Sequence, residues 1–422
     1  MIKRPFFGLG KPNLKYPVVE AQEQDTVKEI PVPDRVTLSL EDPYETDEEL
    51  SVKVGDKVKI GQKLKLKEDD LAYVISSVTG TIAGISQYDG YLGKTYRTIS
   101  IDTADKEKSD DQRSVLGNAG EFLGCLPGKP DFASFLDTQP TLNTIIINGA
   151  DKDLLVGINQ LIVKTEFESL KSGIEYLRES TGVSKIMMAV CPEVSSQAEK
   201  TGADVKVIKS VYPNTLPEII MKNILGTVVP IGKSCEEMGI GFINAEAVLA
   251  IADAITKGQI PVNKMMTVIK KDYTTVNVSA RIGTHIKEIL DALDIEMHHG
   301  DRLVLGGPMM GHAIYSEDVP VSWDTDAIMV QDKNQINVSS DSQCLNCGEC
   351  VRACPAKIPI NMLVRVLENG LYEEAAKEYD LLSCIECGLC SYVCTAQIPV
   401  FHYIMLGKYE FARIESMEES NA

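Results

Sequence analysis

The hydrophobic and polar positions of this chain change their period along its length, and each change predicts a different kind of element. From residue 49 to residue 85, short runs alternate apolar and polar residues between turns at Gly55-Asp56, Gly61 and Gly80. Such alternation is typical of strands with one buried face, and glycine supplies the tight turns between them. This part of the chain is therefore predicted to form a compact all-β unit.

Continuous apolar runs in the middle of the chain alternate with helical stretches. Residues 144–151 (TIIINGAD), 185–190 (KIMMAV) and 205–211 (VKVIKSV) are interpreted as buried strands. Two helical stretches run from the first of these to Glu179, and a third occupies residues 243–260. Alternating strands and helices predict a parallel α/β layer of Rossmann-like type.

The β pattern returns from Met265 to about Ile328, interrupted by one helix. Within that helix Ile286, Ile289 and Leu290 fall on one face, which we expect to point inward. This segment is interpreted as a small β-grasp domain.

A glycine-rich loop, GGPMMG (306–311), lies in this segment. It has enough glycine to approach a ligand or a phosphate closely, but it does not open a helix and lacks the Lys-Ser/Thr of a nucleotide P-loop. The alternative is a tight turn that packs Met309 and Met310 inward.

The last 80 residues contain eight of the eleven cysteines, in two runs of the same spacing. CLNCGECVRACP (344–355) has C-x2-C-x2-C-x3-C spacing followed by proline, and CIECGLCSYVCT (384–395) repeats it with threonine in the proline's place. Three cysteines spaced three residues apart can direct their sulfurs at one point, whereas the fourth faces away. Gly348 and Gly388 follow the second cysteine of each run and allow the chain to curl tightly.

This spacing is that of bacterial [4Fe–4S] pairs, in which the remote cysteine of one run ligates the other cluster. The first cluster is predicted to bind Cys344, Cys347, Cys350 and Cys394. The second is predicted to bind Cys384, Cys387, Cys390 and Cys354. The alternative, a structural zinc site, typically pairs its ligands as C-x2-C with a wide gap and has no use for consecutive C-x2 spacings. The isolated Cys125, Cys191 and Cys235 are interpreted as small core or edge residues.

Between the two runs the period becomes helical. Four apolar residues define one helix face that ends at Gly370: Ile360, Leu363, Val364 and Leu367. A second helix follows through Ala375, Ala376 and Tyr379. The cysteine runs are therefore expected to belong to a helical two-cluster ferredoxin domain, with these apolar residues as its core.

The charge balance restricts the partners. The 422 residues include 61 acidic and 42 basic side chains, which give a formal net charge of -19. Nucleic acids and anionic membrane surfaces require clustered Lys and Arg, so neither is expected as the main partner. We find no signal peptide and no apolar window near the roughly 18 residues of a spanning helix. A cytoplasmic protein is expected, with docking on a membrane protein at the inner face left open, and clustered thiols in that compartment indicate metal ligands.

The order of these patterns resembles the C subunit of the Rnf electron-transport complex (RnfC). Related chains are the flavin subunit of respiratory complex I and the RnfC-like cobalamin reductases. The resemblance covers nearly the whole chain from about residue 40. It rests on VGDKVKIGQKL, INGAD, the segment 305–321 and the two cysteine runs. It implies a multidomain α/β plus β fold: a barrel-sandwich hybrid, a Rossmann-like α/β layer, a β-grasp (SLBB) domain and a C-terminal two-cluster ferredoxin domain.

The expected domain boundaries follow from the patterns and the resemblance together. Residues 1–102 hold the N-terminal segment and the barrel-sandwich hybrid, and residues 103–130 form a charged linker. The Rossmann-like core occupies 131–263, the β-grasp (SLBB) domain 264–332 and the ferredoxin-like domain 333–422.

The resemblance also implies transfer of electrons between NADH, a bound FMN and the clusters. In that family a glycine-rich GxGGAGFP-like loop holds the flavin and the NADH, and an acidic Glu-Cys-Glu-Pro stretch follows the Asn-Gly-Ala turn. This chain has no compact GGAGFP before its first α/β strand, and the acidic stretch reads Asp151-Lys152-Asp153-Leu154.

Phosphate cradling needs backbone N–H groups that are reachable only through small residues. Phe122, Leu123 and Leu126 would obstruct that approach. The FMN and NADH site is therefore predicted to be lost. The residues of a vestigial site would be Gly149, Asp151 and Asp153. The alternative for them is a solvated helix start after a strand turn.

Three functions stay open at this point. The first is an electron-relay subunit with two [4Fe–4S] clusters, working with other redox subunits such as a flavoprotein, a ferredoxin or membrane electron-transport subunits. The second is an NADH-oxidising FMN/iron–sulfur dehydrogenase of RnfC type. The third is a cobalamin-reductase-like protein whose β-grasp domain holds the ligand. The first hypothesis is preferred because the cluster pattern is intact and the coenzyme pattern is degraded.

Overall fold

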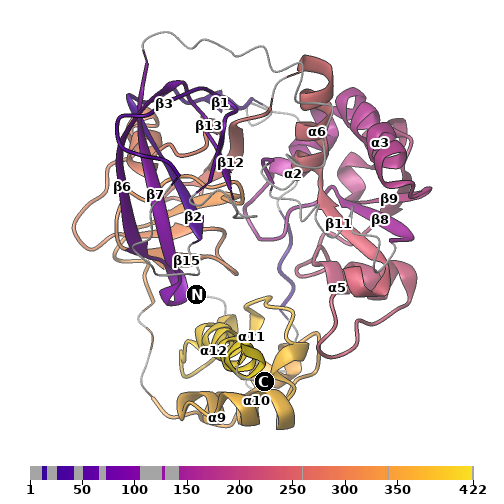
Figure 1. The fold of residues 1–422 in the computed structure, drawn as a ribbon. Coiled ribbons are helices and arrows are strands. Elements are labelled where there is room, and N and C mark those ends of the chain that lie inside the picture. The colour runs from indigo at the N-terminus through magenta and orange to yellow at the C-terminus, as the bar shows by residue number, and fades with distance from the viewer. Residues whose placement is uncertain are drawn as a thin grey trace. The chain divides into compact units, whose positions relative to one another are not determined.

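The structure is a computed structural model (Figure 1). It describes residues 12–16, 26–41, 51–65, 73–104, 126–128, 142–258, 260–337, 339 and 342–420. Most of the predicted linker 103–130 lies outside the described residues, as do Phe122, Leu123 and Cys125. The chain divides into two compact units, which are treated separately below. The C-terminal unit holds Met1–Tyr16, Val211–Ser234 and Asn334–Ala422, and the main unit holds Pro17–Ser210 and Cys235–Lys333.

The main unit begins with the predicted all-β unit. Its antiparallel sheet has the order β2 (Arg35–Glu41), β7 (Thr95–Thr103), β6 (Gly80–Asp89) and β3 (Lys57–Val58). A second pair joins β4 (Lys63–Leu64) to β5 (Val74–Ile75).

Two of its three predicted glycine turns are present. Gly55 and Gly61 have φ of +95° and +81°, a conformation that glycine adopts without strain. Gly80 instead starts β6, where an added Cβ would lie 2.0 Å from the Asp102 carbonyl oxygen. The third turn therefore comes earlier, and Gly80 is needed for close strand pairing.

The α/β layer follows in the same unit. Its four strands are all parallel and have the order β10 (Asp204–Val207), β9 (Lys185–Val190), β8 (Thr144–Asn148) and β11 (Ile240–Asn244). Its main helices are α2 (Ile158–Thr165), α3 (Phe167–Thr181) and α6 (Ala245–Lys257). Shorter helical segments are Pro192–Val194, α4 (Ser195–Ala198), Glu199–Thr201 and Glu236–Met238.

Helices α3 and α6 lie close together (Figure 1), because Gly173 leaves room for the Val248 carbonyl: an added Cβ would lie 2.5 Å from that oxygen. The buried strand predicted at 205–211 is wrong in one respect. β10 ends at Val207 and is the edge strand of the sheet, so it is only partly covered and Val207 is 57% exposed.

A six-stranded mixed sheet completes the main unit. Its order is β1 (Lys28–Glu29), β13 (Thr275–Arg281), β12 (Asn263–Ile269), β16 (Ala327–Gln331), β14 (Arg302–Leu305) and β15 (His312–Ile314). Helix α7 (Ile286–Ala292) buries Ile286, Ile289 and Leu290, as predicted. The N-terminal β1 pairs with β13 in parallel, a contact that the sequence patterns did not indicate.

The C-terminal unit is helical. It contains α8 (Glu349–Ala353), α9 (Ile360–Glu368), α10 (Tyr372–Glu378), α11 (Leu389–Tyr392), α12 (Val400–Ser420), α5 (Pro217–Ile220) and the turns Met221–Leu225 and Leu381–Ser383. The predicted apolar face of α9 is buried, and Gly370 ends the helix with φ of +70°. Helix α12 packs closely on α9, because a Cβ at Gly407 would lie 2.4 Å from Leu367. In the described residues, no helix has the length and apolar character needed to cross a bilayer.

Candidate metal centres and the pocket of the main unit

Four thiols meet in the first group of cysteines. Cys344, Cys347 and Cys350 precede or open α8, where Gly348 bends the chain with φ of +73°. Cys394, which follows α11, lines the same cavity as these three. Apolar side chains complete the lining: Val364, Ile398 and Val400. The structure therefore brings the remote cysteine of the second run to the first run.

The second group mirrors the first. Cys384, Cys387 and Cys390 surround the bend at Gly388, which has φ of +65° before α11. Cys354 ends α8 and lies close enough to Cys384, Cys387 and Cys390 to interact electrostatically with their thiols. Each group thus draws three thiols from one run and one from the other, which is the donor set of paired [4Fe–4S] clusters.

Burial raises the pKa of several thiols in the two groups above the ordinary value for cysteine. Burial, and then repulsion from neighbouring thiolates, raises the pKa of Cys350 to about 11 and that of Cys387 to about 12. Burial also raises the pKa of Cys384 to about 11, although the nearby Lys408 charge lowers it. Cys350, Cys384 and Cys387 are therefore protonated at neutral pH, and iron must displace these protons on binding.

A structural zinc ion is held tetrahedrally, with every sulfur about 2.3 Å away, and its ligands are typically paired as C-x2-C. Each thiol group here combines a C-x2-C-x2-C run with a cysteine of the other run, a pattern typical of [4Fe–4S] pairs.

The two groups differ in their exposure to solvent. In the first, Cys347 is exposed and the adjoining Leu345 is 69% exposed. In the second, Cys354, Cys387 and Cys390 are each buried to 8% exposure or less. Burial and hydrogen bonding around the sulfurs are what tune such clusters, so the two sites are not equivalent.

Sequence reasoning missed the side chains that support these loops. The Tyr212 hydroxyl, buried in the same unit, donates a hydrogen bond of 2.7 Å to the Cys387 carbonyl. Lys408 of α12 donates to the Cys384 carbonyl at 2.6 Å. No local pattern marks a residue 175 positions away from the loop it holds, and Lys408 resembles any polar position of an amphipathic helix.

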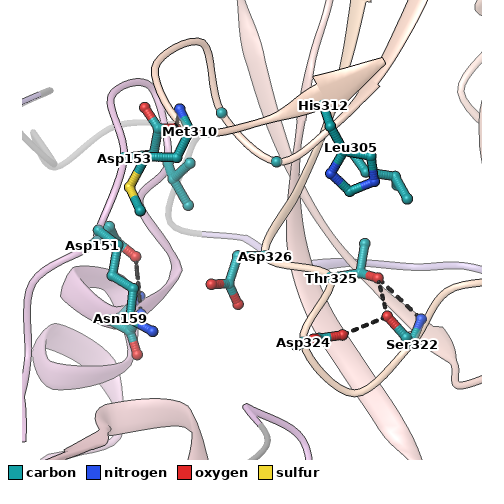
Figure 2. A pocket seen from close by; sticks show the side chains of 14 residues that line it. Asp151, Asp153, Asn159, Leu305, Met310, His312, Ser322, Asp324, Thr325 and Asp326 are labelled. Carbon is teal, nitrogen blue, oxygen red and sulfur yellow. Dashed lines mark hydrogen bonds between the residues drawn. The ribbon is translucent and has the colours of Figure 1, made fainter. Parts of the chain in front are cut away.

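The residues of the predicted vestigial flavin site lie beside a pocket in the main unit, which Figure 2 shows. Asp151 is fully buried, and its carboxylate accepts hydrogen bonds from Asn159 and Gln160 at the start of α2. Gly149 allows close packing of the strands rather than access for a ligand, since an added Cβ would lie 2.8 Å from the Val190 side chain. The solvated helix start considered for these residues is wrong, because the side chains are enclosed.

Asp153 occupies the main-chain donors of the glycine-rich loop. Its carboxylate accepts from the N–H groups of Met309 and Met310 and from that of Leu154. Burial raises the pKa of Asp153 to about 6, against the lowering effect of these hydrogen bonds. Gly307 permits the approach: a Cβ there would lie 2.4 Å from the Asp153 carboxyl carbon. Amides that already serve a carboxylate are not available to a phosphate.

Two more acidic residues line the pocket. Asp324 and Asp326 come from the loop before β16, opposite Asp151 and Asp153, and Lys152 and His312 also belong to the lining. A phosphate group would meet negative charge here rather than free N–H groups. The described lining therefore does not fit the phosphate of a flavin or a nicotinamide coenzyme.

A buried ion pair stands next to this pocket. Lys264 and Glu246 are 0% and 2% exposed, and the Lys264 ammonium donates to the Glu246 carboxylate and, at 3.1 Å, to Asp326. Burial opposes the charge of Lys264, but the two carboxylates outweigh it and raise its pKa. Glu246 also accepts from the Met265 N–H at 2.9 Å, so the pair joins α6 to β12.

The isolated cysteines behave as predicted where they are described. Cys191 and Cys235 are 0% and 8% exposed. Burial raises the pKa of Cys191 to about 11, which keeps it an inert thiol.

Comparison with known proteins agrees with this geometry. Residues 16–107 match the RnfC barrel sandwich hybrid domain, and residues 336–395 match a 4Fe-4S dicluster domain. The chain is RnfC-like. Both the barrel-sandwich hybrid and the two-cluster ferredoxin domain predicted from the sequence are thereby confirmed, as are two [4Fe–4S] clusters as its cofactors.

Curated relatives extend the similarity beyond these domains. The C subunit of a proton-translocating ferredoxin:NAD(+) oxidoreductase complex from Clostridium ljungdahlii is 27% identical over 380 residues, covering 84% of this chain and 83% of that protein. The C subunits of two ion-translocating oxidoreductase complexes are 25% identical in Pectobacterium carotovorum and 24% identical in Buchnera aphidicola. The first alignment covers 81% of this chain and the second 83%. The chain spans about half of the Pectobacterium protein (49%) and 79% of the Buchnera protein.

Among solved structures, an NAD+-reducing [NiFe]-hydrogenase in the H2-reduced state matches with a TM-score of 0.46 and 12% identity. The match covers 70% of this chain and 60% of the hydrogenase chain.

Proposed function

We propose that this RnfC-like chain is an electron-transfer subunit of a multi-subunit redox complex, which relays single electrons through two [4Fe–4S] clusters. The observation that carries the proposal is the exchange of cysteines between the two runs, since Cys394 lies with the first run and Cys354 with the second. Neither run supplies four converging thiols alone. Both sites therefore exist only when the C-terminal unit is folded.

The ligand assignment follows from this exchange. Cys344, Cys347, Cys350 and Cys394 hold the first cluster. Cys384, Cys387, Cys390 and Cys354 hold the second. When bound, such a cluster supplies one-electron exchange at a potential set by its surroundings.

The chain's own residues position the thiols and exclude water. Gly348 and Gly388 bend the two loops, and the apolar side chains around the first cavity, Val364 among them, keep water from its inner side. Because α8 carries a ligand of each site near its two ends, the two sites are joined by one rigid helical turn. This shared element suits exchange of electrons between neighbouring clusters.

We also propose that this chain does not bind FMN or NADH, unlike the family it resembles. The amides of the glycine-rich loop are occupied by Asp153 and the lining is acidic, which supports loss of the FMN and NADH site. The main unit then serves as a docking scaffold for other redox subunits, such as a flavoprotein, a ferredoxin or membrane electron-transport subunits. Through them the chain would work at the inner face of a membrane.

We also propose the finer fold labels and boundaries. A Rossmann-like layer at 131–263 is supported by four parallel strands of order β10–β9–β8–β11. A β-grasp (SLBB) domain at 264–332 is supported by the mixed sheet that packs on α7. In the structure Val211–Ser234 groups with the C-terminal unit, so this segment of the proposed core contacts the ferredoxin-like domain.

Metal and flavin analysis of anaerobically purified protein tests the function. We expect about eight irons, no flavin, and clusters that dithionite bleaches but NADH alone does not. Stoichiometric FMN with bleaching by NADH would instead establish an NADH dehydrogenase. Tight binding of cobalamin would favour a cobalamin reductase, and zinc or no metal at the thiols would overturn the electron relay altogether.

A further inference from the structure

Each ligand loop is held by one basic side chain. The Arg352 guanidinium donates to the Cys347 carbonyl at 3.0 Å and to Glu349 at 2.7 Å. The Lys408 ammonium donates to the Cys384 carbonyl and to Glu386, both at 2.6 Å. The two arrangements are chemically alike: a cation bound to a ligand-loop carbonyl and to a carboxylate of the same loop.

They differ in their access to water. The side chain of Arg352 is 50% exposed, whereas that of Lys408 is 21% exposed. Water and salt screen an exposed charge strongly and a partly buried one much less. The cysteines near Lys408 are also more buried than Cys347. The charge of Lys408 therefore acts on its loop with the larger effect.

The carboxylate of Glu386 does not cancel this effect at the cysteine. The reason is geometric, since the ammonium bonds directly to the Cys384 carbonyl, whereas Glu386 is 36% exposed and partly solvated. A net positive field thus remains at the second group of thiols.

We infer that Lys408 is the residue that sets the reduction potential of the second cluster, with Tyr212 positioning the same loop through the Cys387 carbonyl. The inference rests on the proposed ligand assignment. Reduction brings one electron from an external donor to the cluster and adds one negative charge, with no bond formed and no proton moved. Burial disfavours that added charge, and the neighbouring ammonium offsets the cost without being consumed.

The loop is held from two sides by chemically different groups. Tyr212 is 3% exposed and uncharged, so its hydrogen bond fixes the carbonyl without adding a field. Lys408 fixes the neighbouring carbonyl and adds a full charge. Substituting Tyr212 therefore tests the effect of loop position on the cluster, and substituting Lys408 tests the added effect of charge.

The test is a redox titration of the full chain, monitored by electron paramagnetic resonance, with dithionite as reductant. Lys408→Met should lower the equilibrium constant for reduction of the second cluster about tenfold, which is a drop of about 59 mV in a one-electron reduction potential. The potential of the first cluster should not change. Lys408→Arg should restore most of the potential. Arg352→Met is the matched control and should shift the other cluster by less than half as much. Tyr212→Phe should alter the spectrum of the second cluster with a shift smaller than that of Lys408→Met.

Glu386→Gln provides an opposite change that leaves Lys408 in place. It removes the opposing negative charge, so the potential of the same cluster should rise. The inference is overturned if eight irons are retained and Lys408→Met shifts neither cluster, or if it and Arg352→Met shift their clusters equally. Should Lys408→Met fail to retain iron, a fall of potential in Glu386→Gln would overturn it as well. A wild-type protein without [4Fe–4S] clusters would instead defeat the proposed function itself.

Discussion

The carboxylate of Asp153 accepts a hydrogen bond of 2.7 Å from the main-chain N–H of Met310. This contact joins the end of the first α/β strand to a loop 157 residues later in the chain. The amides of the glycine-rich loop thus donate to a carboxylate of the same unit, and a phosphate would need those same amides. The contact makes the loop part of the scaffold and removes it from ligand binding.

Gly307→Ala should destabilise the main unit by about 1–3 kcal/mol, as overpacking does in a filled site. The added methyl would lie 2.4 Å from the Asp153 carboxyl carbon, so the carboxylate must leave the loop amides. Gly84→Ala is the control, because a Cβ there meets nothing within 4 Å, and it should change stability by less than about 0.5 kcal/mol. Urea denaturation of both variants checks the difference, and equal stabilities would contradict the close approach.

The ionisation of Asp153 should make the main unit less stable as pH rises. Its pKa is raised to about 6 by burial, whereas an unfolded aspartate titrates near 3.9. Between these values the folded protein holds a proton that the unfolded chain has released, so the free energy of unfolding falls with pH. From pH 4 to pH 7 the loss should be about 2 kcal/mol.

Other carboxylates titrate in the same range, so the measurement is the difference in stability between wild type and Asp153→Asn. Asparagine keeps an acceptor oxygen for the loop and cannot ionise. We expect the wild type to lose stability relative to the variant as pH rises from 4 to 7. A difference that grows in the other direction would mean that the loop amides hold the pKa below its ordinary value.

Local patterns predicted the elements better than their associations. The inward face of α7 and the strands β8 and β9 are periodic over enough residues to be recognised. The spacing of the cysteines likewise predicts that Cys354 and Cys394 each serve the opposite run. The two-residue strand β1 has no periodicity, so its pairing with β13 could not be predicted.

Long-range polar contacts were missed for a different reason. The partners Glu246 and Lys264 are ordinary charged residues in the sequence, and only the packing of α6 against β12 removes both from water. Tyr212 looks like a residue of the α/β core until Val211–Ser234 is seen to group with the C-terminal unit. Such contacts depend on tertiary packing, which one sequence does not encode in any local period.

Removing one partner of the Lys264–Glu246 pair should destabilise the main unit more than removing both charges. Lys264→Met leaves Glu246 buried without its cation and should cost about 3–5 kcal/mol. Adding Glu246→Gln removes that charge and keeps an oxygen for the Met265 N–H, so the double variant should recover part of the loss. Asp326 lies at the pocket and can turn to water when Lys264 is absent. A double variant less stable than Lys264→Met would contradict this account.

The exchange of cysteines between the runs predicts which double substitutions lose no more iron than the corresponding single substitutions. Cys344→Ala and Cys394→Ala remove ligands of the same site, so each single variant and the double variant should all retain about four of about eight irons. Cys354→Ala combined with Cys394→Ala removes a ligand from both sites and should leave no cluster. Cys191→Ser is the control, because that thiol is buried in the main unit and belongs to neither group, so the substitution should leave the iron content unchanged. If Cys344→Ala and Cys394→Ala instead lost iron additively, each run would hold its own cluster, and the reciprocal ligation that joins the two sites through α8 would be wrong.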